Sequence, residues 1–230
     1  MRVRVKICGL TTPDGVAAAV RAGADALGFV FAESPRRVDV ARAAEIARDV
    51  PPFVARIAVF RYPSIEEVEH VLDGLAANWV QSEPVPGLAE RISGRAGLLT
   101  VLHDAPDLVD RLERDPDAPR RASAANAAEG FLPHDTDRGP VLLEGPGRGG
   151  RGARPDWERA ARIAKRATLV LAGGLTPENV GDAVRRVHPY AVDVSSGVET
   201  APGVKSAERI LRFVAAVRDA ERIANAEGDS

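Results

Sequence analysis

The sequence has a single cysteine, Cys8, among its 230 residues. One thiol cannot form a disulfide within the chain, and a lone cysteine is more typical of a reducing compartment than of secretion. The first ten residues alternate basic side chains with valines, so they lack the apolar core of a secretory signal. We therefore expect a cytoplasmic protein.

Long apolar runs and an excess of one charge are also missing. No stretch approaches the roughly 20 apolar residues of a membrane helix. The 31 Lys and Arg residues nearly balance the 33 Asp and Glu residues, and they form no basic face of the kind that binds nucleic acid. The histidines at positions 70, 103, 134 and 188 lack the spacing of metal ligands. We therefore expect a globular protein without a nucleic-acid partner, a membrane or a metal site.

Short apolar segments alternate with amphipathic ones along most of the chain. The strands that these patterns predict cover residues 3–7, 24–31, 53–60, 78–81, 97–102, 141–143, 169–171 and 190–194. The predicted helices cover residues 14–21, 41–48, 64–72, 88–92, 108–112, 156–164, 177–187 and 207–222. Eight strand–helix units in a chain of this length predict an α/β protein, a single-domain (β/α)8 TIM barrel over residues 1–222 with a polar tail at 223–230.

Some boundaries carry local signals, and others do not. Thr12 followed by Pro13 is typical of a helix start, and Ser64 with Glu67 forms a predicted capping box. Residues 103–139 are less regular: residues 108–112 have a helical pattern, and residues 115–130 are polar and rich in proline or alanine. We expect a loose helix and an exposed segment in this region. The glycine-rich stretch 145–154 fits either a substrate lid or a solvated linker.

Cys8 ends the first predicted strand, at the barrel face that gathers side chains from many strands. We expect either the adjacent Lys6 or the electropositive rim of the barrel to lower its pKa toward a reactive thiolate. A buried structural cysteine explains the position equally well, so the residues alone leave both interpretations open.

Two loops at the same face are typical of phosphate binding, because glycines let backbone N–H groups approach an anion and serines add donors. They follow the seventh and eighth strands and contain Gly173, Gly174, Ser195, Ser196 and Gly197. Arg36, after the second strand, is a candidate to clamp a carboxylate, although an exposed charge explains it as well. We expect a phosphorylated small-molecule ligand.

Five motifs together resemble the phosphoribosylanthranilate isomerase family of tryptophan biosynthesis. They are Lys6–Thr11 (KICGLT), 28–31 (GFVF), 34–36 (SPR), 172–180 (AGGLTPENV) and 192–199 (VDVSSGVE). The resemblance runs from residue 3 to about residue 218, and its first and last motifs are specific. Members of this family are aldose–ketose isomerases that carry out an Amadori rearrangement by acid and base catalysis without a cofactor.

The resemblance also assigns roles to residues of this sequence. It implies that Cys8 is the general base and that Glu144, at the end of the sixth strand, is the general acid. It implies that Arg36 holds the anthranilate carboxylate, that Asp193 orients the substrate amine, and that Gln81 contacts the substrate. Monomer and homodimer remain open.

The sequence departs from the family pattern at several positions, including residues 82–84 (SEP), where Leu-His-Gly is usual. Glu144 stands where an aspartate is usual, Glu83 where a histidine is usual, and Ala153 where a lysine is common. A glutamate keeps the carboxyl chemistry with a longer reach, and we expect Glu83 to be the neighbouring carboxylate that raises its pKa. These departures leave two alternative functions open. In these alternatives the chain is either a weakened or inactive phosphosugar-binding relative or an isomerase of another aminated ribose phosphate.

Overall fold

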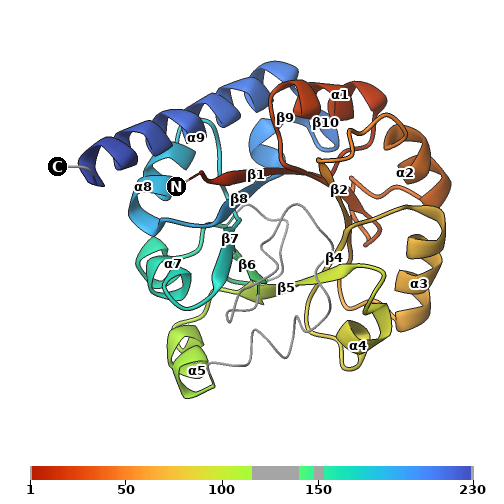
Figure 1. Cartoon of the computed structure of the whole chain (residues 1–230), viewed down its shortest axis with the longest axis horizontal. Helices are drawn as coiled ribbons and strands as arrows, with labels where there is room; N and C mark the ends of the chain where they lie inside the picture. The colour runs from red at the N-terminus through yellow and green to blue at the C-terminus, as the bar shows by residue number, and fades with distance from the viewer. Residues whose placement is uncertain (1, 116–139, 148–152, 229–230) are drawn as a thin grey trace.

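The structure, a computed structural model, describes residues 2–115, 140–147 and 153–228 and forms a closed barrel of eight parallel strands, as the sequence predicts. Helices surround the ring of strands (Figure 1). The strands are β1 (Arg4–Cys8), β2 (Ala26–Val30), β3 (Ala55–Val59), β4 (Trp79–Ser82), β5 (Gly97–His103), β6 (Pro140–Glu144), β7 (Thr168–Leu171) and β8 (Ala191–Val194). They pair in chain order, and β8 closes the ring against β1.

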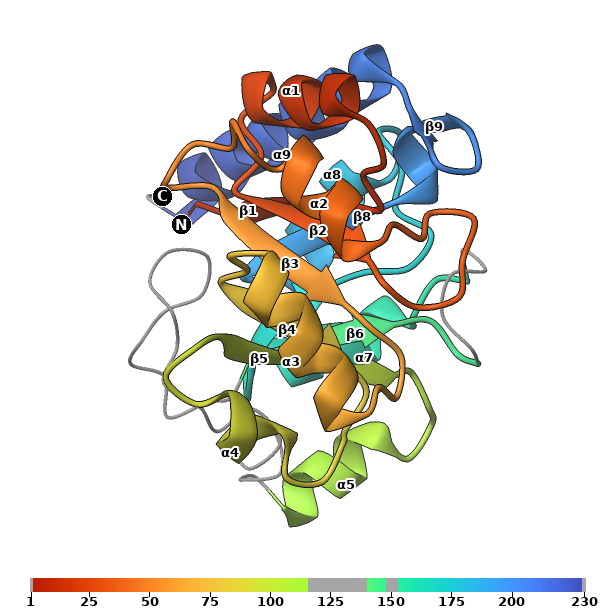
Figure 2. The same cartoon turned by 90° about the vertical axis from the view of Figure 1, so that its right-hand side faces the viewer.

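The outer layer contains the helices α1 (Pro13–Arg21), α2 (Val40–Ile46), α3 (Ile65–Gly74), α4 (Leu88–Ile92), α5 (Leu108–Arg114), α7 (Trp157–Ala164), α8 (Val180–Val187) and α9 (Ala207–Gly228). A short element that we did not expect follows β8. It consists of a 3₁₀ helix, η1 (Ser196–Val198), and an antiparallel hairpin of β9 (Glu199–Ala201) and β10 (Val204–Lys205). In Figure 2, β9 lies at the end of the barrel opposite the two chain termini.

The predicted helix starts are confirmed by their caps. Thr12 accepts a hydrogen bond from the backbone N–H of Gly15 at 3.1 Å, and Pro13 occupies the first turn of α1. Ser64 and Glu67 form the reciprocal capping box of α3. These local signals were readable because a cap involves residues only three apart in sequence.

Several predicted boundaries were wrong by two or more residues, and those of β3, α8 and α9 are examples. β3 begins at Ala55, and Phe53 lies in a turn with 94% of its surface exposed. α8 begins at Val180 because the Asn179 side chain binds the backbone N–H of Thr176, which keeps the preceding residues in a turn. α9 continues beyond residue 222 to Gly228. The segment expected to be loose and exposed, 115–130, lies outside the described residues apart from residue 115.

The buried apolar residues form two layers. One fills the barrel interior and includes Ile57, Trp79, Leu99 and Leu142, and the other packs the strands against the helices. Because side chains alternate along a strand, residues two positions beyond the interior layer also face inward, at the end where the strands finish. That end therefore collects inward-facing polar side chains. Among the described residues, no helix is long and apolar enough to cross a membrane.

Candidate active site

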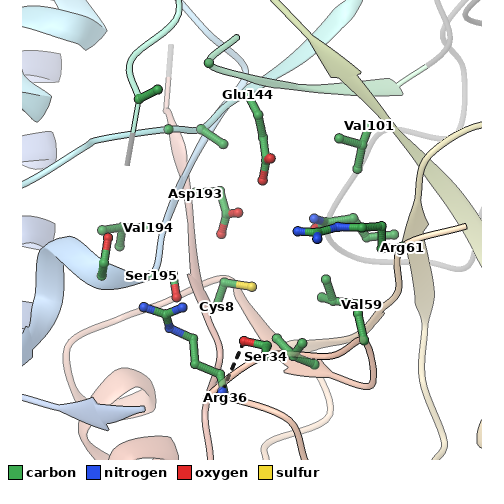
Figure 3. Close-up of a pocket in the computed structure, with 18 of the residues that line it drawn as sticks. Cys8, Ser34, Arg36, Val59, Arg61, Val101, Glu144, Asp193, Val194 and Ser195 are labelled. Carbon is green, nitrogen blue, oxygen red and sulfur yellow. Dashed lines mark hydrogen bonds between the residues drawn. The ribbon is translucent and has the colours of Figure 1, made fainter. Parts of the chain in front are cut away.

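A pocket opens at the carboxyl end of the barrel strands, and all the expected site residues except Gly197 line it (Figure 3). Its polar lining comes from β1, β4, β6 and β8 and from the loops that follow β2, β3, β7 and β8. Figure 3 shows the side chains of Cys8, Asp193 and Glu144 directed toward the same space. The topology thus brings together residues separated by nearly the whole length of the chain.

Cys8 is buried, and its thiol has room because residue 28 is a glycine. The two residues are paired in neighbouring strands, and a Cβ at Gly28 would lie 2.8 Å from Sγ of Cys8. Burial raises the pKa of the Cys8 thiol above its ordinary value, and the nearby charge of Lys6 offsets this only in part. Lys6 lowers the Cys8 pKa, as expected, but the net pKa stays above the ordinary value because desolvation outweighs this attraction.

Lys6 forms a buried ion pair with Asp193, with 3.0 Å between Nζ and Oδ1. Burial alone would lower the pKa of Lys6, but Asp193 and Cys8 raise it above its ordinary value. Lys6 therefore remains an ammonium group within the interior of the barrel. Its charge is available to stabilise a thiolate on Cys8.

The pKa of Glu144 is raised, chiefly by burial and next by the charge of Asp193. Glu83 acts in the same direction, as expected, while His103 and Lys6 act against it. A raised pKa keeps more of the carboxyl group protonated near neutral pH, which a general acid requires.

His103 is a residue of this region that the sequence reasoning missed. Its Nε2 lies 3.3 Å from Oε1 of Glu83, and its Nδ1 lies 4.0 Å from Oε2 of Glu144. Considering histidines only as metal ligands concealed it. The signal was the alternation along β5, in which Leu99 and Val101 face the interior and His103 follows at the strand end.

The loop after β7 has a left-handed backbone that its two glycines allow. Gly173 and Gly174 have φ of +86° and +59°, and a Cβ at Gly173 would lie 2.6 Å from the carbonyl oxygen of Ala153. Ser195 and Ser196 line the pocket. Gly197 does not line it; a side chain there would collide with the Leu175 carbonyl, so this glycine allows the two loops to pack together.

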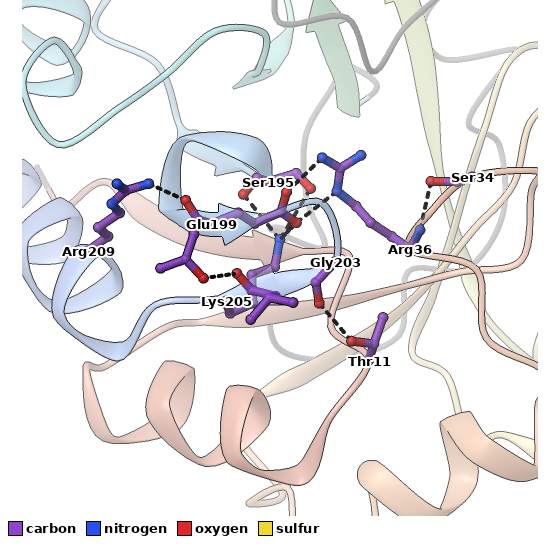
Figure 4. A network of polar contacts seen from close by, with 10 residues as sticks. Thr11, Ser34, Arg36, Ser195, Glu199, Gly203, Lys205 and Arg209 are labelled. Carbon is purple, nitrogen blue, oxygen red and sulfur yellow. Dashed lines mark hydrogen bonds and ion pairs between the residues drawn. The ribbon is translucent and has the colours of Figure 1, made fainter.

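Arg36 lines the pocket but already has a carboxylate partner. Its Nε and Nη2 donate to Glu199 at 2.8 and 2.7 Å, and Nζ of Lys205 donates to Glu199 and to Ser195 (Figure 4). Glu199 and Lys205 belong to the unexpected hairpin, and sequence reasoning missed both. Burial alone would raise the pKa of Glu199, but the hydrogen bonds from Arg36 and Lys205 hold it below its ordinary value.

Within the described parts of the chain, no group of three or more His, Cys, Asp or Glu residues could hold a metal ion. The choice between a lid and a linker at 145–154 remains a prediction, since residues 148–152 lie outside the described residues.

The family model of N-(5′-phosphoribosyl)anthranilate isomerase matches residues 5–82 and 122–216. The chain belongs to this family. The phosphoribosylanthranilate isomerase of Bordetella parapertussis is 44% identical to it over 97% of this chain and 100% of the relative. That of Pseudomonas aeruginosa is 43% identical over 96% of this chain and 97% of the relative.

Solved phosphoribosylanthranilate isomerases have the same architecture. The crystal structure from Thermotoga maritima matches with a TM-score of 0.78 and 34% identity, over 94% of this chain and 99% of that one. Another, with a TM-score of 0.76, 32% identity and the same coverage, is a complex with reduced 1-(o-carboxyphenylamino)-1-deoxyribulose 5-phosphate. The family resemblance and the barrel predicted from the sequence are thereby confirmed.

Proposed function

We propose that this chain catalyses the Amadori rearrangement of N-(5′-phosphoribosyl)anthranilate to 1-(2-carboxyphenylamino)-1-deoxyribulose 5-phosphate. The observation that carries the proposal is the shared pocket of Cys8 and Glu144, with the loops after β7 and β8 at its edge. A base, an acid and an anion site are what an aldose–ketose isomerisation of a phosphosugar needs, without a cofactor. We further propose that it works in the cytoplasm, where a lone thiol stays reduced.

Glu144 is the general acid in this proposal. Its carboxyl group donates a proton to the furanose ring oxygen, and the bond between that oxygen and C1′ breaks. The lone pair of the anthranilate nitrogen forms the C1′=N bond, so the ring-opened intermediate is an iminium ion. Asp193 and Gln81 line the same pocket. In this proposal Asp193 orients the substrate amine, and Gln81, on β4, contacts the substrate.

Cys8 is the general base. Its thiolate removes the proton from C2′, and the electrons of the C–H bond form C1′=C2′ and neutralise the iminium nitrogen. The enolamine then becomes the ketone: the 2′-hydroxyl loses its proton and C1′ gains one. The rearrangement is thus a redistribution of protons, with no net oxidation or reduction and no co-reactant.

The reactive form has a thiolate on Cys8 and a protonated carboxyl group on Glu144. The pKa of both groups is raised by burial, so the carboxyl group is favoured in its required form and the thiolate is not. The Lys6 charge stabilises the thiolate and so increases the reactive fraction. We expect the plot of kcat/KM against pH to be bell-shaped. The two apparent pKa values of this plot belong to Cys8 and Glu144 as a coupled pair.

The rest of the pocket binds the two ends of the substrate. We propose that Gly173, Gly174, Ser195 and Ser196 bind the phosphate. The close packing of Gly197 against Leu175 holds the loops after β7 and β8 next to each other, which supports a shared phosphate site. We also propose that Arg36 binds the anthranilate carboxylate, which would share its guanidinium group with Glu199.

The direct test is the fluorescence of freshly made N-(5′-phosphoribosyl)anthranilate after purified chain is added. Decay at an enzymatic rate, lost in Cys8→Ala with folding intact, is the expected result. Absence of decay in the wild type would favour the phosphosugar-binding alternative, while decay only with another aminated ribose phosphate would change the substrate.

A further inference from the structure

The carboxyl end of β5 places an imidazole between two carboxyl groups. His103 is the register partner of Glu144, and the N–H of the next residue, Asp104, donates to the backbone carbonyl of Glu144 at 2.9 Å. β4 lies on the other side of β5 and leads directly into Glu83. The backbone therefore fixes His103 between the two glutamates.

The contacts of the ring are unequal. Nε2 is 3.3 Å from Oε1 of Glu83, whereas Nδ1 is 4.0 Å from Oε2 of Glu144. Nδ1 is buried and has no hydrogen-bond partner among the residues that the structure describes, and the same holds for Oε2 of Glu83. A buried polar atom without a hydrogen-bond partner destabilises the fold. A position of the Glu144 side chain that brings Oε2 within hydrogen-bond distance of Nδ1 is therefore favourable.

We propose that His103, held by Glu83, is a positioning residue for the carboxyl group of Glu144. The inference rests on the proposed function, in which Glu144 is the acid. When both ring nitrogens carry a proton, Nε2 donates to Glu83 and Nδ1 donates to Oε2 of Glu144. This contact leaves the other carboxyl oxygen of Glu144 for the proton that passes to the substrate.

The same contact acts after the proton has left. Glu144 is then a carboxylate, and the N–H of Nδ1 lies next to the new charge, where a charge-assisted hydrogen bond is strong. Besides His103, the groups that act on Glu144 are Asp193 from β8, Glu83 directly after β4 and Lys6 from β1. Of this set, only His103 and Lys6 oppose the raised pKa, and Lys6 is already paired with Asp193.

Two amide substitutions separate the two sides of the ring. The amide of His103→Asn reaches the position of Nδ1 and retains a donor toward Glu144, while that of His103→Gln reaches the position of Nε2 and retains a donor toward Glu83. We expect kcat of His103→Gln to fall at least about tenfold with little change in KM. We expect His103→Asn to keep most of the wild-type kcat. The exposed His70 on α3 offers matched controls, His70→Asn and His70→Gln, which should leave kcat unchanged.

Equal losses in the two His103 variants, a larger loss in His103→Asn, or a change in KM alone would overturn the proposal. An activity-independent measurement separates it from the proposed function. In ¹⁵N NMR of the ring, Glu144→Gln should shift the Nδ1 signal of His103, and Glu83→Gln should shift the Nε2 signal. An Nδ1 signal unchanged by Glu144→Gln would overturn the positioning role, whereas an inactive wild type with both shifts would reject only the proposed reaction.

Discussion

Nζ of Lys6 lies 3.0 Å from Oδ1 of Asp193, and both side chains are buried inside the barrel. Lys6 is two residues from Cys8 on the same inward-facing side of β1, so one ammonium group balances the carboxylate and also acts on the thiol. Stability of the barrel and reactivity of the thiol therefore depend on the same side chain.

Lys6→Met should weaken both properties. It leaves Asp193 buried without its partner, which costs about 3–5 kcal/mol in the free energy of unfolding. It also removes the more influential of the two lysine charges that oppose the rise in the Cys8 pKa, so alkylation of this single cysteine should require higher pH. Urea unfolding and the pH dependence of iodoacetamide labelling measure the two effects.

The double variant Lys6→Met/Asp193→Leu is the control for that experiment. Removing both charges should restore most of the lost stability, because no unpaired buried charge remains. If the double variant were as unstable as Lys6→Met, packing of the Lys6 stem would account for the loss.

Gly28→Ala should disturb the position of the thiol. Its new Cβ would lie 2.8 Å from Sγ and 3.1 Å from Cα of Cys8, so the thiol has to move. We expect kcat to fall by roughly 10–100-fold, since displacement of a reacting group by about 1 Å can cost on the order of 100-fold. Gly181→Ala on α8, whose Cβ would have no contact shorter than 3.4 Å, should keep wild-type kinetics. Equal kcat in the two variants would show that the Cys8 position is not critical.

Glu199→Gln should change how stability depends on pH. The pKa of Glu199 is depressed in the folded chain, so the carboxylate stabilises the fold above its unfolded pKa of about 4.3. That stability disappears as pH falls through the lower folded value. Urea unfolding from pH 7 to pH 3 should show that the wild type has a larger free energy of unfolding than Glu199→Gln. This difference should be largest at neutral pH and should decrease in acid. A difference independent of pH would contradict this assignment.

Ser196→Asp should weaken anion binding at the proposed phosphate site. A carboxylate there would repel phosphate, and we expect the Kd for inorganic phosphate to increase at least about tenfold by calorimetry. Ser93→Asp is the matched control, because Ser93 is exposed after α4, near the start of β5. Unchanged affinity in Ser196→Asp would remove the phosphate from this end of the barrel.

The sequence predicted those parts of the molecule that depend on near neighbours or on strand ends. Cys8 could be placed because it ends a strand of a parallel barrel, whereas Glu144 was placed by the family resemblance. The contact between Arg36 and Glu199 could not, because it depends on the packing of a hairpin 163 residues away. The direction of the Cys8 pKa shift could not be predicted either. It depends on how far burial of the thiol outweighs the Lys6 charge, and the sequence does not show how deeply the thiol is buried.

The measurement that tests the account most directly compares kcat of Glu144→Gln with kcat of Glu144→Asp. The decay of substrate fluorescence reports the rate in both variants. Glutamine keeps the size of the side chain but has no acidic proton, so Glu144→Gln should lose at least about 100-fold in kcat. Glu144→Asp should stay active, because it retains the acid. A fully active Glu144→Gln would contradict the assignment of Glu144 as the acid. Glu83 in the pocket would be the next residue to test, with 135 and 137, which lie outside the described residues, after it.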